Sequence, residues 1–144
     1  MYVFAAAHSA AFAFLLWAAV IDARERIIPD GAVLGVLAAG LAAILFGNAL
    51  FTTWACSLLS SVLTFTAFFC LSVLSRGGVG GGDVKMAGAL GFLFGLPDIC
   101  WLLVVACFAG LVWGLVRRER GIPFAPFMAV GFVAAEAVRL FMYF

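Results

Sequence analysis

Long apolar runs separated by short polar breaks make up nearly the whole chain. A helix that crosses a bilayer needs about 20 mostly apolar residues, and most of the runs approach that length. We therefore predict six transmembrane helices, with a polar loop after the first, a turn at Gly47-Asn48 after the second and a glycine-rich stretch after the third. The expected helices cover residues 3–21, 31–46, 49–75, 84–96, 99–116 and 122–143.

The fourth run, residues 84–96, is too short to cross a bilayer from side to side. As a helix it would rise about 20 Å, whereas the hydrocarbon core is about 30 Å thick. Either it does not cross, or it begins below the membrane surface. In the second case the preceding glycine-rich loop lies at the membrane boundary, where irregular backbone is tolerated only inside protein or along a cavity.

The composition agrees with a membrane protein. Hydrophobic residues make up 67% of the chain and charged residues only 10%, whereas soluble domains carry about 25% charged residues. We therefore expect an all-α integral membrane protein that forms a single domain over residues 1–144. The formal net charge of +1 gives no indication of a nucleic-acid partner.

The basic residues are unevenly distributed between the two ends of the expected helices. With six spans, the loops at 22–30, 75–85 and 117–121 share one side and carry seven of the eight basic residues. Basic residues in short loops mark the cytoplasmic face, so both termini should lie outside. The seven are Arg24, Arg26, Arg76, Lys85, Arg117, Arg118 and Arg120.

Two aspartates fall on this cytoplasmic side. Asp22 ends the first expected helix and Asp83 begins the fourth. If these helices touch, the two carboxyl groups would share one proton and act as base and acid on a water molecule, without a metal or cofactor. A helix start favours a carboxylate at Asp83 and a helix end disfavours one at Asp22, but which residue is the acid stays open.

Other interpretations of the same residues stay open at this point. Asp22 and Asp83 could be ordinary charges at a membrane surface, with Asp83 capping a helix. A small transporter or structural subunit could use the glycine-rich loop to line a pore. No Gly-Lys-Ser/Thr follows the glycines, which argues against a phosphate-binding loop, and the four cysteines form no C-x-x-C pair that would indicate a metal site.

Three segments resemble, in order, the motifs of the type IV prepilin peptidases. They are "DARERIIPD", "GGGDVKMAGALGFLFG", which contains a G-x-G-D motif, and "GIPFAPFMAVG". The resemblance implies an aspartyl endopeptidase of the bacterial inner membrane, with Asp22 and Asp83 as the catalytic pair. Its substrate would be a prepilin with a hydrophobic N-terminal helix, whose basic leader is cut at the cytoplasmic face. The resemblance also implies an active-site loop formed by Gly80, Gly81, Gly82 and Lys85.

The resemblance is closest to the short, peptidase-only form of tight-adherence (Flp-type) pilus systems. Longer family members carry a cytoplasmic loop with paired C-x-x-C motifs and a methyltransferase activity, so we expect no zinc-binding or methyltransferase segment here. Presenilin-like and signal-peptide-peptidase-like proteases share G-x-G-D and form an alternative. They carry Pro-Ala-Leu near the last helix, however, whereas Phe127 follows Pro126 in this chain.

Several further residues have two interpretations each. Lys85 could hold the negative charge of the aspartate pair, bind an acidic substrate residue, or simply mark the cytoplasmic face. Two prolines and two phenylalanines near the last helix could shape its start or gate the substrate. These four are Pro123, Phe124, Pro126 and Phe127.

Three polar residues fall inside apolar runs, far from the predicted site. Glu136 and Arg139 are spaced so that they could pair on one helix face, or Arg139 could reach the lipid headgroups. His8 is expected to be a hydrogen-bonded interior group on the side opposite the aspartates.

Overall fold

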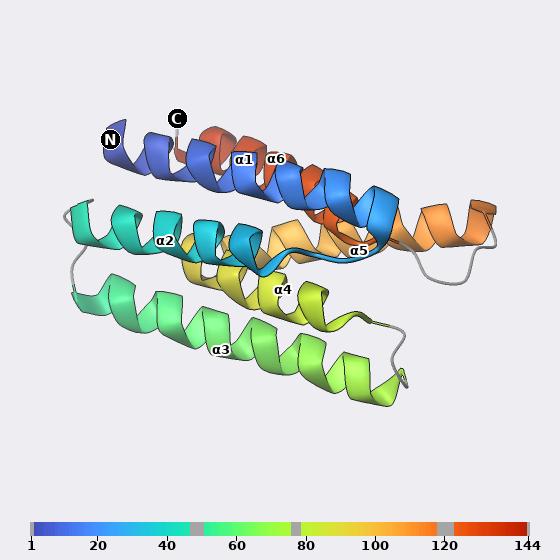
Figure 1. Cartoon of the computed structure of the whole chain (residues 1–144). Helices are drawn as coiled ribbons and strands as arrows, with labels where there is room; N and C mark the ends of the chain where they lie inside the picture. The colour runs from blue at the N-terminus through green and yellow to red at the C-terminus, as the bar shows by residue number, and fades with distance from the viewer. Residues whose placement is uncertain (1, 47–50, 76–78, 118–122, 144) are drawn as a thin grey trace.

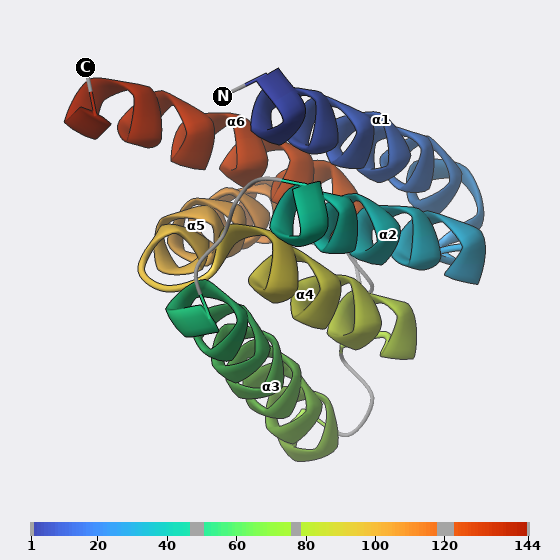
Figure 2. The same ribbon diagram turned by 90° about the vertical axis from the view of Figure 1, so that its left-hand side faces the viewer.

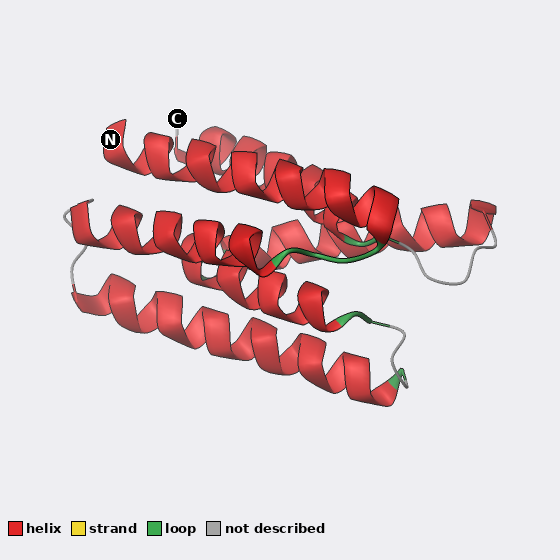
Figure 3. Cartoon of the chain, in the orientation of Figure 1, coloured by secondary structure: helices red, strands yellow, loops and turns green. Residues whose placement is uncertain are grey.

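The computed structural model of the chain describes residues 2–46, 51–75, 79–117 and 123–143, and this part is all-helical, as expected (Figure 3). Four of its helices are long and apolar enough to cross a membrane, while α2 is apolar but shorter. The helices are α1 (Tyr2–Glu25), α2 (Asp30–Phe46), α3 (Phe51–Leu74), α4 (Gly81–Phe94), α5 (Asp98–Arg117) and α6 (Ala125–Tyr143).

The helices at the predicted site begin and end at other residues than expected. Helix α1 continues through Glu25, so Asp22 lies inside it. Helix α4 begins at Gly81, so the expectation of a loop was wrong for Gly81 and Gly82, whereas Gly80 does precede the helix. Polar groups at the end of an apolar run do not by themselves end a helix, because their side chains can face other protein groups. The predicted turn at 47–48, the basic residues at 76, 118 and 120, and the expected start of the last helix at 122 lie outside the described residues.

Helix α4 is the central helix of the bundle. It packs against α3 on one side and α2 on the other, α1 packs against α2 and α6, and α5 packs against α6 (Figures 1 and 2). Nine of its 14 residues are buried. The longer helices α3 and α5 instead expose large apolar side chains such as Val62, Leu111 and Phe108. A surface of this kind is suited to lipid and would be costly in water.

Small residues let α3 and α4 approach closely. A Cβ added at Gly91 would stand 2.2 Å from Oγ1 of Thr64 and 3.0 Å from the carbonyl oxygen of Ser60. Thr64 donates its hydroxyl to that Ser60 oxygen at 2.8 Å, and Ser61 donates to the carbonyl of Gly88 at 2.9 Å. Close packing of backbones through small residues is the usual way to join helices in a membrane. It fixes α4, and therefore Asp83, against α3.

The two ends of the bundle differ. The N-terminal end of α1 and the C-terminal end of α6 lie at one end, whereas the C-terminal end of α1 and the N-terminal ends of α4 and α6 lie at the other (Figure 1). Asp22 and Asp83 are therefore brought to the same end of the molecule, together with the first residues of α6.

Candidate active site

Asp22 lies one turn before the end of α1 and is only 5% exposed. Its Oδ2 accepts a hydrogen bond of 3.0 Å from the backbone N–H of Ala125, the first residue of α6. The first amides of a helix have no partner inside the helix, and the helix dipole makes this end positive. The start of α6 therefore stabilises negative charge on Asp22.

The local sequence of α6 explains why the Ala125 amide is available. Pro126 has no N–H to offer, which costs little in the first turn of a helix. The amides of Phe127 and Met128 both donate to the carbonyl oxygen of Phe124, at 3.0 and 3.1 Å. Ala125 is thus left with an N–H that points out of the helix, and Asp22 accepts it.

Asp83 occupies the first turn of α4, behind the extended residue Gly80. Its Oδ2 accepts a hydrogen bond of 3.3 Å from the Gly80 N–H, so the carboxyl group does cap the helix. Its Oδ1 is buried and accepts no hydrogen bond from any described residue. A buried carboxyl oxygen without a protein partner can carry a proton or bind water or substrate.

The environment of Asp83 favours its protonated form. Asp83 lies outside the four candidate membrane spans. Burial raises the pKa of Asp83 from 3.8 to about 6, the negative charge of Asp22 adds to the rise, and the Gly80 N–H opposes it. The two carboxyl groups therefore act on each other electrostatically, although α1 and α4 each pack mainly against α2 and not against each other. The helix start alone would favour the carboxylate at Asp83, and burial outweighs that effect.

The segment between α1 and α2 completes this end of the site. A Cβ at Gly82 would stand 2.8 Å from the Cβ of Ile28, so residue 82 must be small for this segment to pack on α4. Arg26 turns the chain at the end of α1 with a φ of 57°, in the left-handed region that non-glycine residues seldom adopt. The contact between Gly82 and Ile28 could not be predicted from the sequence alone. The only indication of it was the Ile-Pro pair of the first motif.

The aromatic residues at the start of α6 bridge neighbouring helices. The ring of Phe124 lies 5.9 Å from that of Phe68 in α3, and the ring of Phe127 lies 6.1 Å from that of Trp113 in α5. Pro123, Phe124, Pro126 and Phe127 are all partly buried. The predicted segment therefore lies beside Asp22, and its closest link to that residue is the backbone amide of Ala125, which sequence reasoning did not single out.

Lys85 does not face the aspartate pair. Its Nζ lies 2.8 Å from Oδ1 of Asp30, and the two side chains are 54% and 71% exposed. This ion pair joins α4 to the first residue of α2. Each residue of an α-helix is rotated by about 100° from the one before, so residues two apart lie on nearly opposite faces. Lys85 therefore points away from Asp83.

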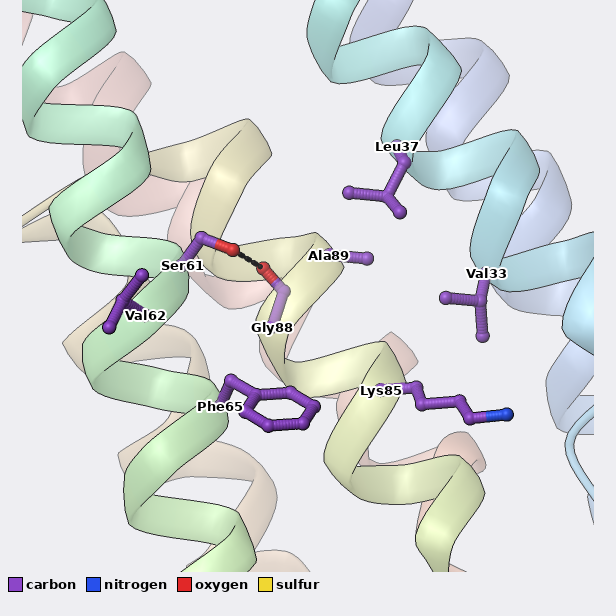
Figure 4. Close-up of a pocket in the computed structure, with 8 residues that line it drawn as sticks. All are labelled: Val33, Leu37, Ser61, Val62, Phe65, Lys85, Gly88 and Ala89. Atoms are coloured by element: carbon purple, nitrogen blue, oxygen red, sulfur yellow. Dashed lines mark hydrogen bonds between the residues drawn. The ribbon is translucent and has the colours of Figure 1, made fainter.

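Beside Lys85, α2 and α3 enclose an apolar groove of about 370 Å³ whose floor is α4 (Figure 4). At the floor of the groove, the Ser61 hydroxyl of α3 donates a hydrogen bond to the Gly88 carbonyl oxygen of α4. Asp83 is not among the residues that line it. The lining residues are Val33, Leu37, Ser61, Val62, Phe65, Lys85, Gly88 and Ala89.

The fold and site together define a helical membrane protein in which a buried and a partly buried carboxyl group, from helices far apart in the sequence, share one end of the bundle. Comparison with known proteins is more specific. The model of the type IV leader peptidase family matches residues 9–115, which include both aspartates. The chain belongs to this family, whose members are peptidases.

Individual relatives agree with the family match. The prepilin leader peptidase/N-methyltransferase of Burkholderia pseudomallei (strain 1026b) is 33% identical over 131 residues, which cover 83% of this chain and 42% of that protein. The protein of the same name from Bacillus subtilis (strain 168) is 27% identical over 128 residues, 84% of this chain and 51% of that protein. The chain thus spans about half the length of these relatives or less. No solved structure matches.

Proposed function

We propose that this chain is an aspartic endopeptidase that removes the leader of type IV prepilins, with Asp22 and Asp83 as its catalytic residues. The family and the names of its relatives support the class of substrate. The observation that carries the proposal is the pair itself. Two carboxyl groups act on each other at one end of the bundle, and one of them has a raised pKa and an unpartnered oxygen.

The surroundings of the two residues support different roles. Asp83, with a pKa of about 6, would hold the proton and donate it to the carbonyl oxygen of the scissile peptide. Asp22, bonded to the Ala125 amide, would remain the carboxylate and take a proton from the attacking water. The water oxygen bonds to the carbonyl carbon to give a gem-diol. When the C–N bond breaks, the amine takes the proton that Asp22 had accepted, and one hydroxyl of the gem-diol returns a proton to Asp83.

The proposed orientation places the site at the cytoplasmic face of a bacterial inner membrane. All six helices enter the bilayer, the first turn of α4 with Asp83 lies at the membrane boundary, and both termini lie outside. It is supported by the N-terminal end of α1 and the C-terminal end of α6 lying at the opposite end (Figure 1). It is also supported by Arg24, Arg26 and Lys85, which lie at or beside the helix ends that carry the aspartates. We further propose an Flp-type prepilin, with a hydrophobic N-terminal helix, as the substrate. Only the peptidase activity is proposed for this chain.

Co-expression with an Flp-type prepilin tests the function directly. Asp22→Asn and Asp83→Asn should each abolish leader removal, seen as an unshifted pilin band and confirmed by N-terminal sequencing. Asp30→Asn is the matched control, because Asp30 lies at the same end but is largely exposed, and it should leave cleavage intact. Full processing by either aspartate variant, at normal protein levels, would rule out the proposed pair.

A further inference from the structure

A second polar contact joins α1 and α6 at the end of the bundle opposite the aspartates. Nδ1 of His8 in α1 is hydrogen-bonded to Oε1 of Glu136 in α6. His8 is only 4% exposed, and the rings of Phe94 and Phe132 lie 5.1 and 6.2 Å from its own. This confirms His8 as a hydrogen-bonded interior group. The charge of Arg139 also acts on Glu136, and Arg139 lies 3.7 Å from Asp98 of α5.

Such a pair needs an explanation, because His8 is buried and the Glu136 side chain is only 30% exposed, and placing charged groups in an apolar bundle is costly and often adds little net stability. The best-established use of a buried polar pair is to fix the register of two helices. A shift of α6 along α1 by one turn, about 5.4 Å, would leave both His8 and Glu136 facing apolar groups.

The same two helices are joined at the active site by the hydrogen bond between Asp22 and Ala125. Along α1, His8 and Asp22 are 14 residues apart, or about 21 Å. Between the two polar contacts the rings of Phe12 and Phe132 pack at 5.1 Å. The interface therefore has an aromatic contact in its middle and a polar bond near each of its two ends.

We propose that His8 and Glu136 form a positioning pair that sets the register of α1 against α6 and thereby holds the Asp22 carboxylate on the Ala125 amide. The pair does not touch the substrate. It acts through Asp22, so its role in cleavage rests on the function proposed above. The contact that it is proposed to maintain can be measured without any substrate.

Amide hydrogen exchange at Ala125 gives this substrate-free measurement. Labelling with carbonyl-¹³C phenylalanine and ¹⁵N alanine selects the Phe-Ala pairs of the chain, which are 4–5, 12–13, 108–109 and 124–125. Asp22→Asn assists the assignment, because it alters the acceptor of the Ala125 amide. The amide of Ala109, inside α5, is an internal reference for the intact fold.

His8→Leu/Glu136→Leu removes both polar groups together, so neither is left buried without the other. Arg139, whose charge also acts on Glu136, keeps Asp98 as a partner. In this variant we expect Ala125 to exchange about tenfold faster, which corresponds to the loss of about one hydrogen bond, with Ala109 unchanged. On a prepilin peptide we expect kcat to fall about tenfold or more with KM within twofold, because the carboxylate is misplaced while binding is kept.

Two further variants sharpen the test. Glu136→Gln can still accept a hydrogen bond from the imidazole and should keep both the exchange protection and kcat. Ser9→Ala changes the neighbouring residue, whose hydroxyl bonds only within α1 to the Ala5 carbonyl, and should change neither. Unchanged protection of Ala125 in the folded double variant would overturn the proposal, and loss of protection in Glu136→Gln would also count against it. If the wild type cleaves no prepilin, the proposed function fails, but the exchange result still decides the positioning role.

Discussion

The carboxylate of Asp22 and the amide of Ala125 are 103 residues apart in the chain and 3.0 Å apart in the structure. The contact joins the end of α1 to the start of α6, and so connects the first and third sequence motifs directly. A helix N-terminus is a good site for an anion because its free amides and its dipole act together. Helix α6 thus contributes to the site through its backbone, whatever side chains surround it.

Replacing Ala125 with proline should test this contact with little disturbance of the fold. Proline removes the N–H that Asp22 accepts, yet it is well tolerated at the first position of a helix. We expect the Ala125→Pro variant to insert and accumulate normally while kcat for prepilin cleavage falls about 10- to 100-fold. Pro126→Ala, at the next position, is the control and should retain most of the activity. Wild-type turnover by Ala125→Pro would show that Asp22 does not depend on α6.

Cleavage should depend on the proton held by Asp83. Because burial and the charge of Asp22 raise the pKa of Asp83 to about 6, the pair holds one proton near pH 5.5 and loses it as the pH rises. We expect kcat/KM, measured in liposomes from pH 5 to 9, to fall with a midpoint near pH 6. Return to pH 5.5 after incubation at pH 8 should restore the activity. An activity that instead rises through pH 6 to a plateau would contradict the assignment of Asp83 as the acid.

The same pKa has a consequence for stability. The folded protein binds the Asp83 proton more tightly than the unfolded chain does, so stability should be greatest below about pH 4 and should fall as the pH rises through about 6. Asp83→Asn cannot ionise, so the variant should not lose stability in this way as the pH rises. At pH 8 the variant should therefore be more stable than the wild type, by about 1–3 kcal/mol, and the difference should shrink at pH 4.

Thermal unfolding at the two pH values measures this effect. The exposed carboxyl group of Asp30 offers the control, since Asp30→Asn should change the melting temperature little at either pH. A lower melting temperature of Asp83→Asn at pH 8 would mean that ionised Asp83 stabilises the fold.

Because α3 packs closely on α4, adding one methyl group at Gly91 should have a large effect on stability. In Gly91→Ala the new Cβ would meet Thr64 Oγ1 and the Ser60 carbonyl oxygen, and the latter belongs to a helix backbone that cannot easily move. We expect a loss of stability of about 1–3 kcal/mol, measured by thermal unfolding in nanodiscs. Thr64→Ala should recover part of the loss, because it removes the nearer of the two atoms.

Gly81→Ala is the matched control for this change. A Cβ at Gly81 meets no atom within 4 Å, and alanine favours the helix by up to about 1 kcal/mol. Gly81→Ala should therefore be neutral or stabilising. Equal losses in the two variants would show that the α3–α4 contact is not the cause.

The helices could be predicted from apolar runs, but the bounds near the site could not. Glycines 81 and 82 were expected in a loop because glycine disfavours helices in isolation. They are helical in α4 because Gly82 packs against Ile28 and the helix is covered by its neighbours. Similarly, α1 runs past Asp22 because a contact from α6 satisfies the carboxylate inside the bundle.

The sequence by itself determined the membrane-spanning composition, the helical class, the order of the three motifs and the two aspartates that deserve testing. These follow from residue type and spacing, which are local properties. Only the tertiary structure decided that Asp22 bonds to Ala125, that Lys85 turns to Asp30 and that His8 pairs with Glu136. Such partners depend on which helices pack side by side and at what register, and the buried side chains of many helices set that register together.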